Sequence, residues 1–210
     1  MGGDDEERAT AFGQLEPQSP VDRLGTWLSG REIRRHVGSF AGKDVGDFGC
    51  GFDATFSRTI TEEVASLVLV DVALAPDLGE HRRVRALTGP LPEVLDDLAD
   101  ASLDVVLCIS VLEHLWEPER LLAAFRRLLR SGGVCIVNVP SWLGKRALEF
   151  SAFKLGLSPA CEMDDHKDYY DPRDLWPLLV RSGFKPSNIS CRRHKLGLNT
   201  IAVCRISEDT

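Results

Sequence analysis

Short apolar runs alternate with stretches of helical periodicity through the middle of the chain. The runs at residues 67–71, 103–110 and 134–139 are almost wholly apolar, which is typical of strands covered on both faces of a sheet. The residues just before Gly49 and residues 84–88 predict two shorter strands. This alternation predicts an α/β fold with a mostly parallel sheet, in which ligands bind beyond the carboxyl ends of the strands.

Five helices are expected beside these strands, over residues 21–36, 53–66, 118–131, 142–157 and 172–182. Pro118 suits the first turn of its helix, and the pair Gly132 and Gly133 is expected to end it. Two further strands, at residues 189–195 and 198–205, predict an antiparallel hairpin that closes the sheet.

The first 20 residues differ from the rest of the chain. They are polar and acidic and lack periodic apolar positions, so residues 1–20 are predicted to form a flexible tail. Residues 21–210 suit one domain with a sizeable core. The tail lacks the apolar centre of a secretory signal, and no stretch is long and apolar enough to span a bilayer. A cytoplasmic protein without a membrane partner is therefore expected.

Charge and cysteine content narrow the function further. A formal net charge of −7 and a pI near 5.3 argue against a broad surface for nucleic acid and favour a small or weakly charged ligand. The six cysteines contain no C-x-x-C pair and several lie inside apolar runs, which predicts reduced thiols and neither a disulfide framework nor a zinc site. They are Cys50, Cys108, Cys135, Cys161, Cys191 and Cys204.

Residues 44–55 predict a strand, a glycine turn and the start of a helix. Gly49 and Gly51 let the backbone bend sharply and leave no Cβ between it and a ligand. With Ala54 their spacing fits the dinucleotide fingerprint, and Asp71 lies 20 residues after Gly51, where an acid would hold a ribose hydroxyl. The motif therefore indicates a nucleotide-like ligand.

Asp47, two residues before the first glycine, narrows the choice of ligand. Its carboxylate would repel the pyrophosphate of a dinucleotide and attract an ammonium or a sulfonium. S-adenosylmethionine (SAM) carries both cations and no phosphate. At this point the residues resemble the class I SAM-dependent methyltransferases, whose first motif has the form acid-x-Gly-x-Gly-x-Gly. Here Asp53 stands in place of the third glycine.

The same resemblance extends to residues 104–115, to the Gly132 and Gly133 turn, and to residues 138–140. It implies a doubly wound, mostly parallel seven-stranded sheet with a C-terminal antiparallel hairpin, the Rossmann-like methyltransferase fold. The His-x-x-Tyr-Tyr-x-Pro pattern that begins at His166 looks like the C-terminal part of small-molecule methyltransferases that act on sugars and secondary metabolites. Residues 140–171 would then form an insert on the acceptor side.

The resemblance also implies which residues bind the cofactor, whose product form is S-adenosylhomocysteine. Asp47 would face the methionine end of SAM, Asp71 would accept hydrogen bonds from the ribose hydroxyls, and residues 88–91 would lie near the adenine. Ser110 would flank the methionine portion through its backbone. The predicted cofactor positions are Asp47, Gly49, Gly51, Asp71, Leu91 and Ser110.

Two histidines are candidates for handling the acceptor proton, because histidine titrates near neutral pH. His166 is the preferred general base because Tyr169 and Tyr170 lie beside it in sequence, and Tyr169 joins it as a candidate catalytic residue. His114 is the alternative base. A purely structural role remains open for both histidines. His114 could be a helix-entry residue that bonds to a loop carbonyl, and His166 could anchor the insert.

A metal site is not predicted. Asp164, Asp165 and His166 include metal-binding side chains, but three adjacent residues rarely converge on one ion, so a solvated turn is expected instead.

The sequence thus predicts methyl transfer from SAM to a small-molecule acceptor, with a hydroxyl of a metabolite or sugar preferred. Two alternatives stay open: an NAD-dependent oxidoreductase, which should not tolerate Asp47, and a non-catalytic SAM-binding partner subunit. No nucleic-acid partner is expected, and the oligomeric state is left open.

Overall fold

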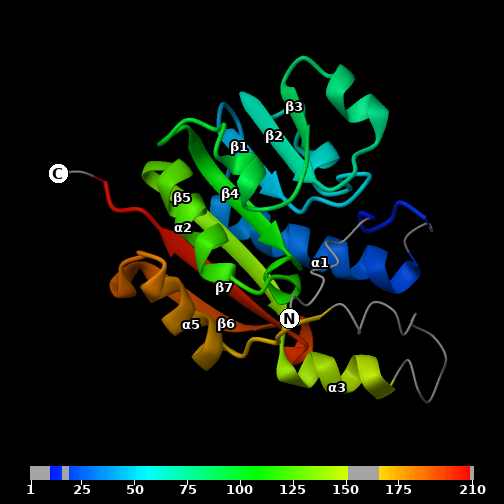
Figure 1. The fold of residues 1–210 in the computed structure, drawn as a ribbon, viewed down its shortest axis with the longest axis vertical. Helices are drawn as coiled ribbons and strands as arrows, with labels where there is room; N and C mark the ends of the chain where they lie inside the picture. Colours follow the sequence, from blue (N-terminus) through cyan, green and yellow to red (C-terminus); the bar gives the residue numbers. More distant parts are fainter. Residues whose placement is uncertain (1–9, 16–18, 151–165, 209–210) are drawn as a thin grey trace, which may run out of the picture.

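The computed structural model describes residues 10–15, 19–150 and 166–208. One seven-stranded sheet runs through the molecule in the order β3-β2-β1-β4-β5-β7-β6 (Figure 1). Strands β1 to β5 are parallel to one another, whereas β7 is antiparallel to both β5 and β6. The strands are β1 (Asp44–Phe48), β2 (Ser66–Asp71), β3 (Val84–Thr88), β4 (Leu103–Ile109), β5 (Leu129–Pro140), β6 (Ile189–His194) and β7 (Asn199–Arg205). The predicted mostly parallel sheet with a closing hairpin is confirmed.

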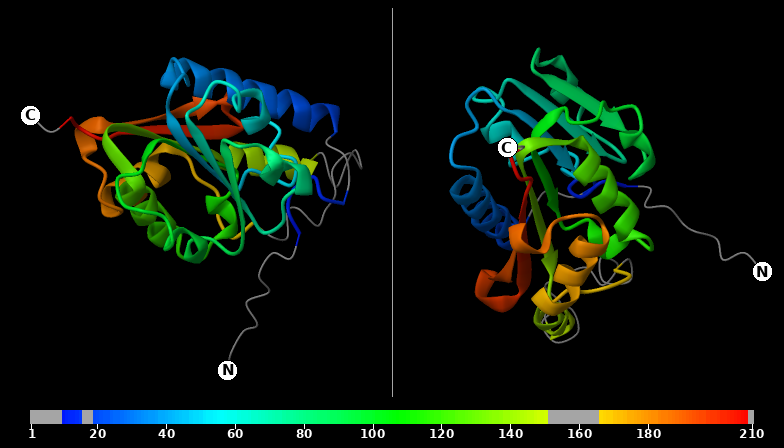
Figure 2. Two further views of the ribbon diagram at one scale, coloured as in Figure 1. Left: turned by 90° about the horizontal axis from the view of Figure 1, so that it is seen from above. Right: turned by 90° about the vertical axis from the view of Figure 1, so that its left-hand side faces the viewer.

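Helices cover both faces of this sheet. Helix α1 lies on one face, and α2 and α5 lie together on the other (Figure 2). Helix α3 follows β5 directly at the carboxyl edge of the sheet (Figure 1). The bounds are α1 (Pro20–Val37), α2 (Pro118–Leu128), α3 (Trp142–Phe150) and α5 (Pro172–Arg181). No helix among the described residues is long and apolar enough to cross a membrane.

The helix predicted over residues 53–66 is wrong. The chain there forms turns around one short 3₁₀ segment, Ser57–Thr59. Its Thr side chains bond to nearby carbonyls: Thr59 Oγ1 donates to Phe56 O and Thr61 Oγ1 donates to Ser57 O. Such local bonds, together with the stiffness of β-branched side chains, compete with a regular helix.

The predicted end of α2 is also wrong. The helix ends at Leu128 rather than at the glycine pair, because the carbonyls of Arg127 and Leu128 accept hydrogen bonds from the backbone of Ala101 and Ser102. Gly133 instead lies inside β5, where a Cβ would come within 2.9 Å of the Arg130 carbonyl.

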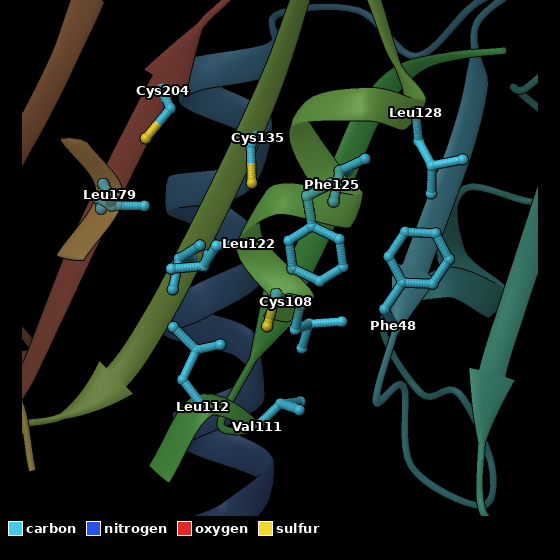
Figure 3. Close-up of a cluster of buried hydrophobic side chains, with 14 of the residues drawn as sticks. Phe48, Cys108, Val111, Leu112, Leu122, Phe125, Leu128, Cys135, Leu179 and Cys204 are labelled. Carbon is cyan, nitrogen blue, oxygen red and sulfur yellow. The ribbon is translucent and has the colours of Figure 1, made fainter. Parts of the chain in front are cut away.

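The core has one apolar layer on each face of the sheet. On the α2 side the ring of Phe48 stacks on that of Phe125, with 5.2 Å between centroids, and fixes the end of β1 against the helix (Figure 3). Cys108, Cys135 and Cys204 line the same layer, and the five cysteines of the described residues are free. Cys161 lies outside those residues.

Part of the predicted tail, at Ala11 and Phe12, lies against the body of the domain. Ala11 is buried, and the carbonyl of Phe12 accepts a hydrogen bond of 2.9 Å from the backbone N–H of Phe52. This segment therefore sits beside the glycine turn that follows β1.

Candidate active site

The turn after β1 is held tightly against the neighbouring strand. The backbone N–H groups of Gly49 and Cys50 both donate to the carbonyl of Val70, at 2.8 and 3.2 Å. Gly49 and Gly51 have φ angles of +78° and +76°, which glycine adopts without steric cost. A Cβ at Gly49 would also lie 2.1 Å from Val111 Cγ2, so only glycine fits there without movement of its neighbours.

Asp71, at the end of β2, holds this turn in place. Its Oδ2 accepts a hydrogen bond of 2.8 Å from the backbone N–H of Gly51, and its Oδ1 accepts one of 2.8 Å from Val72. Asp71 is therefore in direct contact with the glycine turn. Each carboxylate oxygen has a further lone pair that a ligand hydroxyl could use.

Asp47 lies beneath the turn and is only 5% exposed. Burial raises its pKa to about 6; a hydrogen bond of 2.6 Å from Ser57 Oγ acts in the opposite direction, and the negative charge of Asp71 adds to the rise. Among the described residues, no positively charged side chain contributes to the pKa of this carboxyl group. The site therefore favours a ligand that brings a positive charge.

Ser110 and Leu91 complete the carboxyl edge of these strands. Ser110 is exposed directly after β4, has a φ of +56°, and donates its backbone N–H to Asn138 O at 2.7 Å. A positive φ at a residue other than glycine stores strain, which is common at functional sites. Leu91, after β3, is half-buried against the core. Because β3, β2, β1 and β4 are consecutive in the sheet, all six predicted cofactor positions lie within or just after the carboxyl ends of adjacent strands.

The histidines predicted to handle a proton come together. The rings of His114 and His166 lie edge to face with 4.8 Å between centroids, although 52 residues separate them. Nδ1 of His166 is 2.9 Å from the hydroxyl of Tyr169. The contact arises because the backbone N–H of Lys167 donates to the carbonyl of Glu113, at 2.6 Å. His114, His166 and Tyr169 therefore form one cluster.

Tyr170 does not join this cluster, although it adjoins Tyr169 in sequence. Its side chain is buried in the apolar layer on the α2 side, where burial raises the pKa of the phenol. Its backbone N–H donates to Pro140 O at 3.0 Å, which ties the segment to the end of β5.

Several residues near the cluster were not found from the sequence. Glu113 is 1% exposed, and its ligand oxygen lies within 4.8 Å of ring nitrogens of His114 and His166. The ring of Trp142 lies 5.6 Å from that of Tyr169. Burial lowers the pKa of Lys195 to about 8, although the negative charge of Glu113 acts to raise it. Adjacent Glu and His at a strand end could have indicated Glu113, but no local pattern marks Lys195.

Comparison with known proteins agrees with this geometry. The family model described as "Methyltransferase domain" matches residues 46–137. The chain is 33% identical over 119 residues to a probable S-adenosylmethionine-dependent methyltransferase of Mycolicibacterium smegmatis, covering 55% of this chain and 46% of that protein. It is 33% identical over 145 residues to a ubiquinone biosynthesis O-methyltransferase of Idiomarina loihiensis, covering 63% and 56%. The chain spans about half the length of these curated relatives.

Solved structures share the fold at low sequence identity. A SAM-dependent methyltransferase from Archaeoglobus fulgidus superposes with a TM-score of 0.62 at 16% identity, covering 86% of this chain and 94% of that one. The structure titled [4+2]-cyclase SpnF has a TM-score of 0.63 at 14% identity, covering 97% and 86%. At these identities the likeness establishes the fold alone.

Proposed function

We propose that the chain is a class I SAM-dependent methyltransferase and that it transfers a methyl group from SAM to a hydroxyl of a small metabolite or sugar. One observation carries the proposal. Asp47, a buried carboxyl group to whose pKa no cation of the described residues contributes, lies under a glycine turn that Asp71 holds. One histidine of a contacting pair follows the neighbouring strand β4. SAM supplies a methyl group on a positively charged sulfur and leaves as S-adenosylhomocysteine.

The proposed cofactor contacts follow from charge and backbone geometry. Asp47 would attract the ammonium of the methionine portion, and that positive charge would lower the pKa of its carboxyl group again. Asp71 would accept hydrogen bonds from the ribose hydroxyls while it keeps its bond to Gly51. Ser110 would flank the methionine portion through its backbone, and Leu91 would lie near the adenine.

Methyl transfer to a hydroxyl requires the protein to align donor and acceptor and to remove the hydroxyl proton. His166 is the proposed general base. Tyr169 would orient its ring through the contact at Nδ1, which leaves Nε2 to accept the proton. His114 packs against the same ring and is the alternative base.

We place the acceptor beside the segment that follows β5. Within the proposed single domain of residues 21–210, residues 140–171 would form the acceptor side. Trp142 from the start of this segment and Tyr169 from its end pack together, with Lys145 Nζ 5.5 Å from the ring of Tyr169. Asp164, Asp165 and the rest of residues 151–165 lie outside the described residues. The net charge of −7 favours a small acceptor over nucleic acid.

Two alternatives share part of this geometry. An NAD-dependent oxidoreductase would need to place a pyrophosphate near Asp47, which charge repulsion disfavours. A SAM-binding protein without methyl transfer is the second alternative, since the proposed cofactor contacts do not depend on an acceptor.

Binding and turnover separate these functions. Calorimetry should show S-adenosylhomocysteine binding and no comparable NAD binding. Turnover of methyl-labelled SAM with a panel of hydroxylated metabolites and sugars should then give a labelled product. NAD binding without S-adenosylhomocysteine binding would reject the proposal, and cofactor binding without any labelled product would favour the non-catalytic role.

A further inference from the structure

We propose that Glu113, His114 and His166 together bind one divalent transition-metal ion. These side chains offer one carboxylate oxygen and two imidazole nitrogens, and the three atoms lie within 4.8 Å of one another. The residues are contributed by two segments of the chain, η4 (Leu112–His114) after β4 and the residues just before α5.

The spacing needs only a small adjustment to fit an ion. Zinc bonds of about 2.0–2.2 Å in tetrahedral geometry place neighbouring ligand atoms about 3.3–3.5 Å apart. The side chains would therefore close by at most about 1.5 Å, a movement within reach of small χ rotations. Both histidines are half-buried rather than fully packed, so their rings have room for this movement, whereas the buried Glu113 provides a fixed point.

The backbone already holds the two segments at this distance. Lys167 and Asp168 donate their N–H groups to the carbonyl of Glu113, at 2.6 and 3.3 Å. His166 is thus anchored next to the carboxylate that would share its ion. A site that is assembled before the ion arrives loses less entropy on binding than one that the ion must assemble.

Tyr169 fits the role of an outer partner of the site. Histidines that bind metals usually engage their second ring nitrogen in a hydrogen bond, which fixes the ring orientation. The Tyr169 hydroxyl, 2.9 Å from Nδ1 of His166, provides that bond and leaves Nε2 for the ion.

The donor set indicates the class of metal. Two imidazoles favour zinc and other first-row divalent ions, whereas magnesium and calcium favour oxygen ligands alone. Three protein ligands leave coordination positions open, which is typical of catalytic rather than structural sites. Lys195 would weaken metal binding, because its positive charge competes with the ion for the carboxylate of Glu113.

The role of the ion in catalysis rests on the proposed function. A hydroxyl bound at an open position loses its proton to water more readily, because the cation stabilises the alkoxide. With the ion bound, His166 would be a ligand and not the general base. Metal-loaded and metal-free protein would therefore remove the acceptor proton in different ways.

Direct titration tests the site without relying on activity. The full chain is treated with a chelator, dialysed, and titrated with Co²⁺ by visible absorption and with Zn²⁺ by competition calorimetry. We expect one ion per chain. Loss of a side chain that only hydrogen-bonds a metal ligand costs about 10–100-fold in affinity. Loss of a ligand itself should cost at least as much, so His166→Ala and His114→Ala should each weaken metal binding by about 100-fold or more.

His81→Ala is the matched control. It removes another histidine that pairs with a glutamate, since His81 Nε2 lies 2.9 Å from Glu62 on the exposed surface. This variant should bind as the unmodified chain does. Glu113→Gln preserves the shape of the side chain and replaces the alanine variants if circular dichroism shows that they are unfolded; it too should lose the ion.

The outcomes separate this site from the proposed function. No stoichiometric binding, or equal binding by the His166→Ala and unmodified chains, overturns the metal site. Calorimetry with S-adenosylhomocysteine on the same samples gives an independent result. Cofactor binding without metal binding leaves the proposed function in place, and metal binding without cofactor binding supports the metal site alone.

Discussion

The carboxylate of Asp71 accepts a hydrogen bond from the backbone N–H of Gly51, at 2.8 Å. This bond links the end of β2 to the turn that follows β1, so one residue shapes the glycine turn and, in the proposed function, would also bind the cofactor. A change at Asp71 should therefore affect cofactor binding through two routes.

Asp71→Ala should weaken S-adenosylhomocysteine binding by about 1.5–3 kcal/mol, the range for a hydrogen bond to a charged group. Calorimetry measures the change. Asp77→Ala is a suitable control, because Asp77 is an exposed acid of the same region that pairs with Arg58. Unchanged affinity in Asp71→Ala would remove Asp71 from the cofactor site.

Asp47→Asn should stabilise the free protein. The pKa of Asp47 is raised from 3.8 to about 6, so stability that is present below pH 3.8 is lost as pH rises through 6. The loss of folding free energy is complete at pH 8, where it is about 3 kcal/mol, and partial at pH 5, where it is about 1.5 kcal/mol. Urea unfolding at the two pH values should show the variant gaining more at pH 8 than at pH 5.

The same variant should bind the cofactor less well, since Asn lacks the charge that attracts an ammonium. The loss should be smaller for an analogue that lacks the methionine ammonium. Equal losses for both ligands would show that Asp47 does not face that group, and a stability gain that is independent of pH would contradict its raised pKa.

The strands of the sheet and the residues at their carboxyl ends could be predicted from local sequence patterns. Apolar runs predict the strands, and Asp47, Gly49 and Asp71 stand at fixed distances from their ends. Helix ends were harder to predict, because the end of α2 depends on hydrogen bonds from Ala101 and Ser102, which belong to another loop.

The acceptor side was only partly predictable for the same reason. His114 and His166 could be proposed one at a time from their chemistry, but their contact depends on the carbonyl of Glu113 accepting from Lys167. Tyr169 and Tyr170 are adjacent in sequence, but only Tyr169 contacts His166, because Tyr170 is buried in the apolar layer on the α2 side. Such non-local contacts leave no pattern in the sequence.

Gly49→Ala should destabilise the protein more than Gly51→Ala. Both positions have a φ near +77°, a conformation that costs an L-residue about 1–2 kcal/mol. At Gly49 a Cβ would also meet Val111 Cγ2 at 2.1 Å, whereas at Gly51 the nearest atom, Phe12 O, lies at 3.2 Å. Thermal unfolding of both variants isolates the clash, and Val111→Ala should relieve it in Gly49→Ala alone. Equal destabilisation in the two variants would contradict the close packing.

The assignment of the general base is tested best in chelator-treated protein, where His166 has no ion to bind. A positioned base contributes about 10²–10⁴ in rate, so His166→Ala should lose most turnover while its affinity for S-adenosylhomocysteine stays unchanged. His114→Ala should lose less, because the Tyr169 hydroxyl at Nδ1 of His166 is placed to orient that ring as the base.

Tyr169→Phe serves as the control for orientation. It keeps the ring that packs on Trp142 and removes only the hydroxyl, so turnover should fall less than in His166→Ala. If His114→Ala loses the rate and His166→Ala keeps it, His114 is the base. If neither variant loses turnover, neither histidine is needed to remove a proton. The acceptor then reaches the site already deprotonated or is not a hydroxyl.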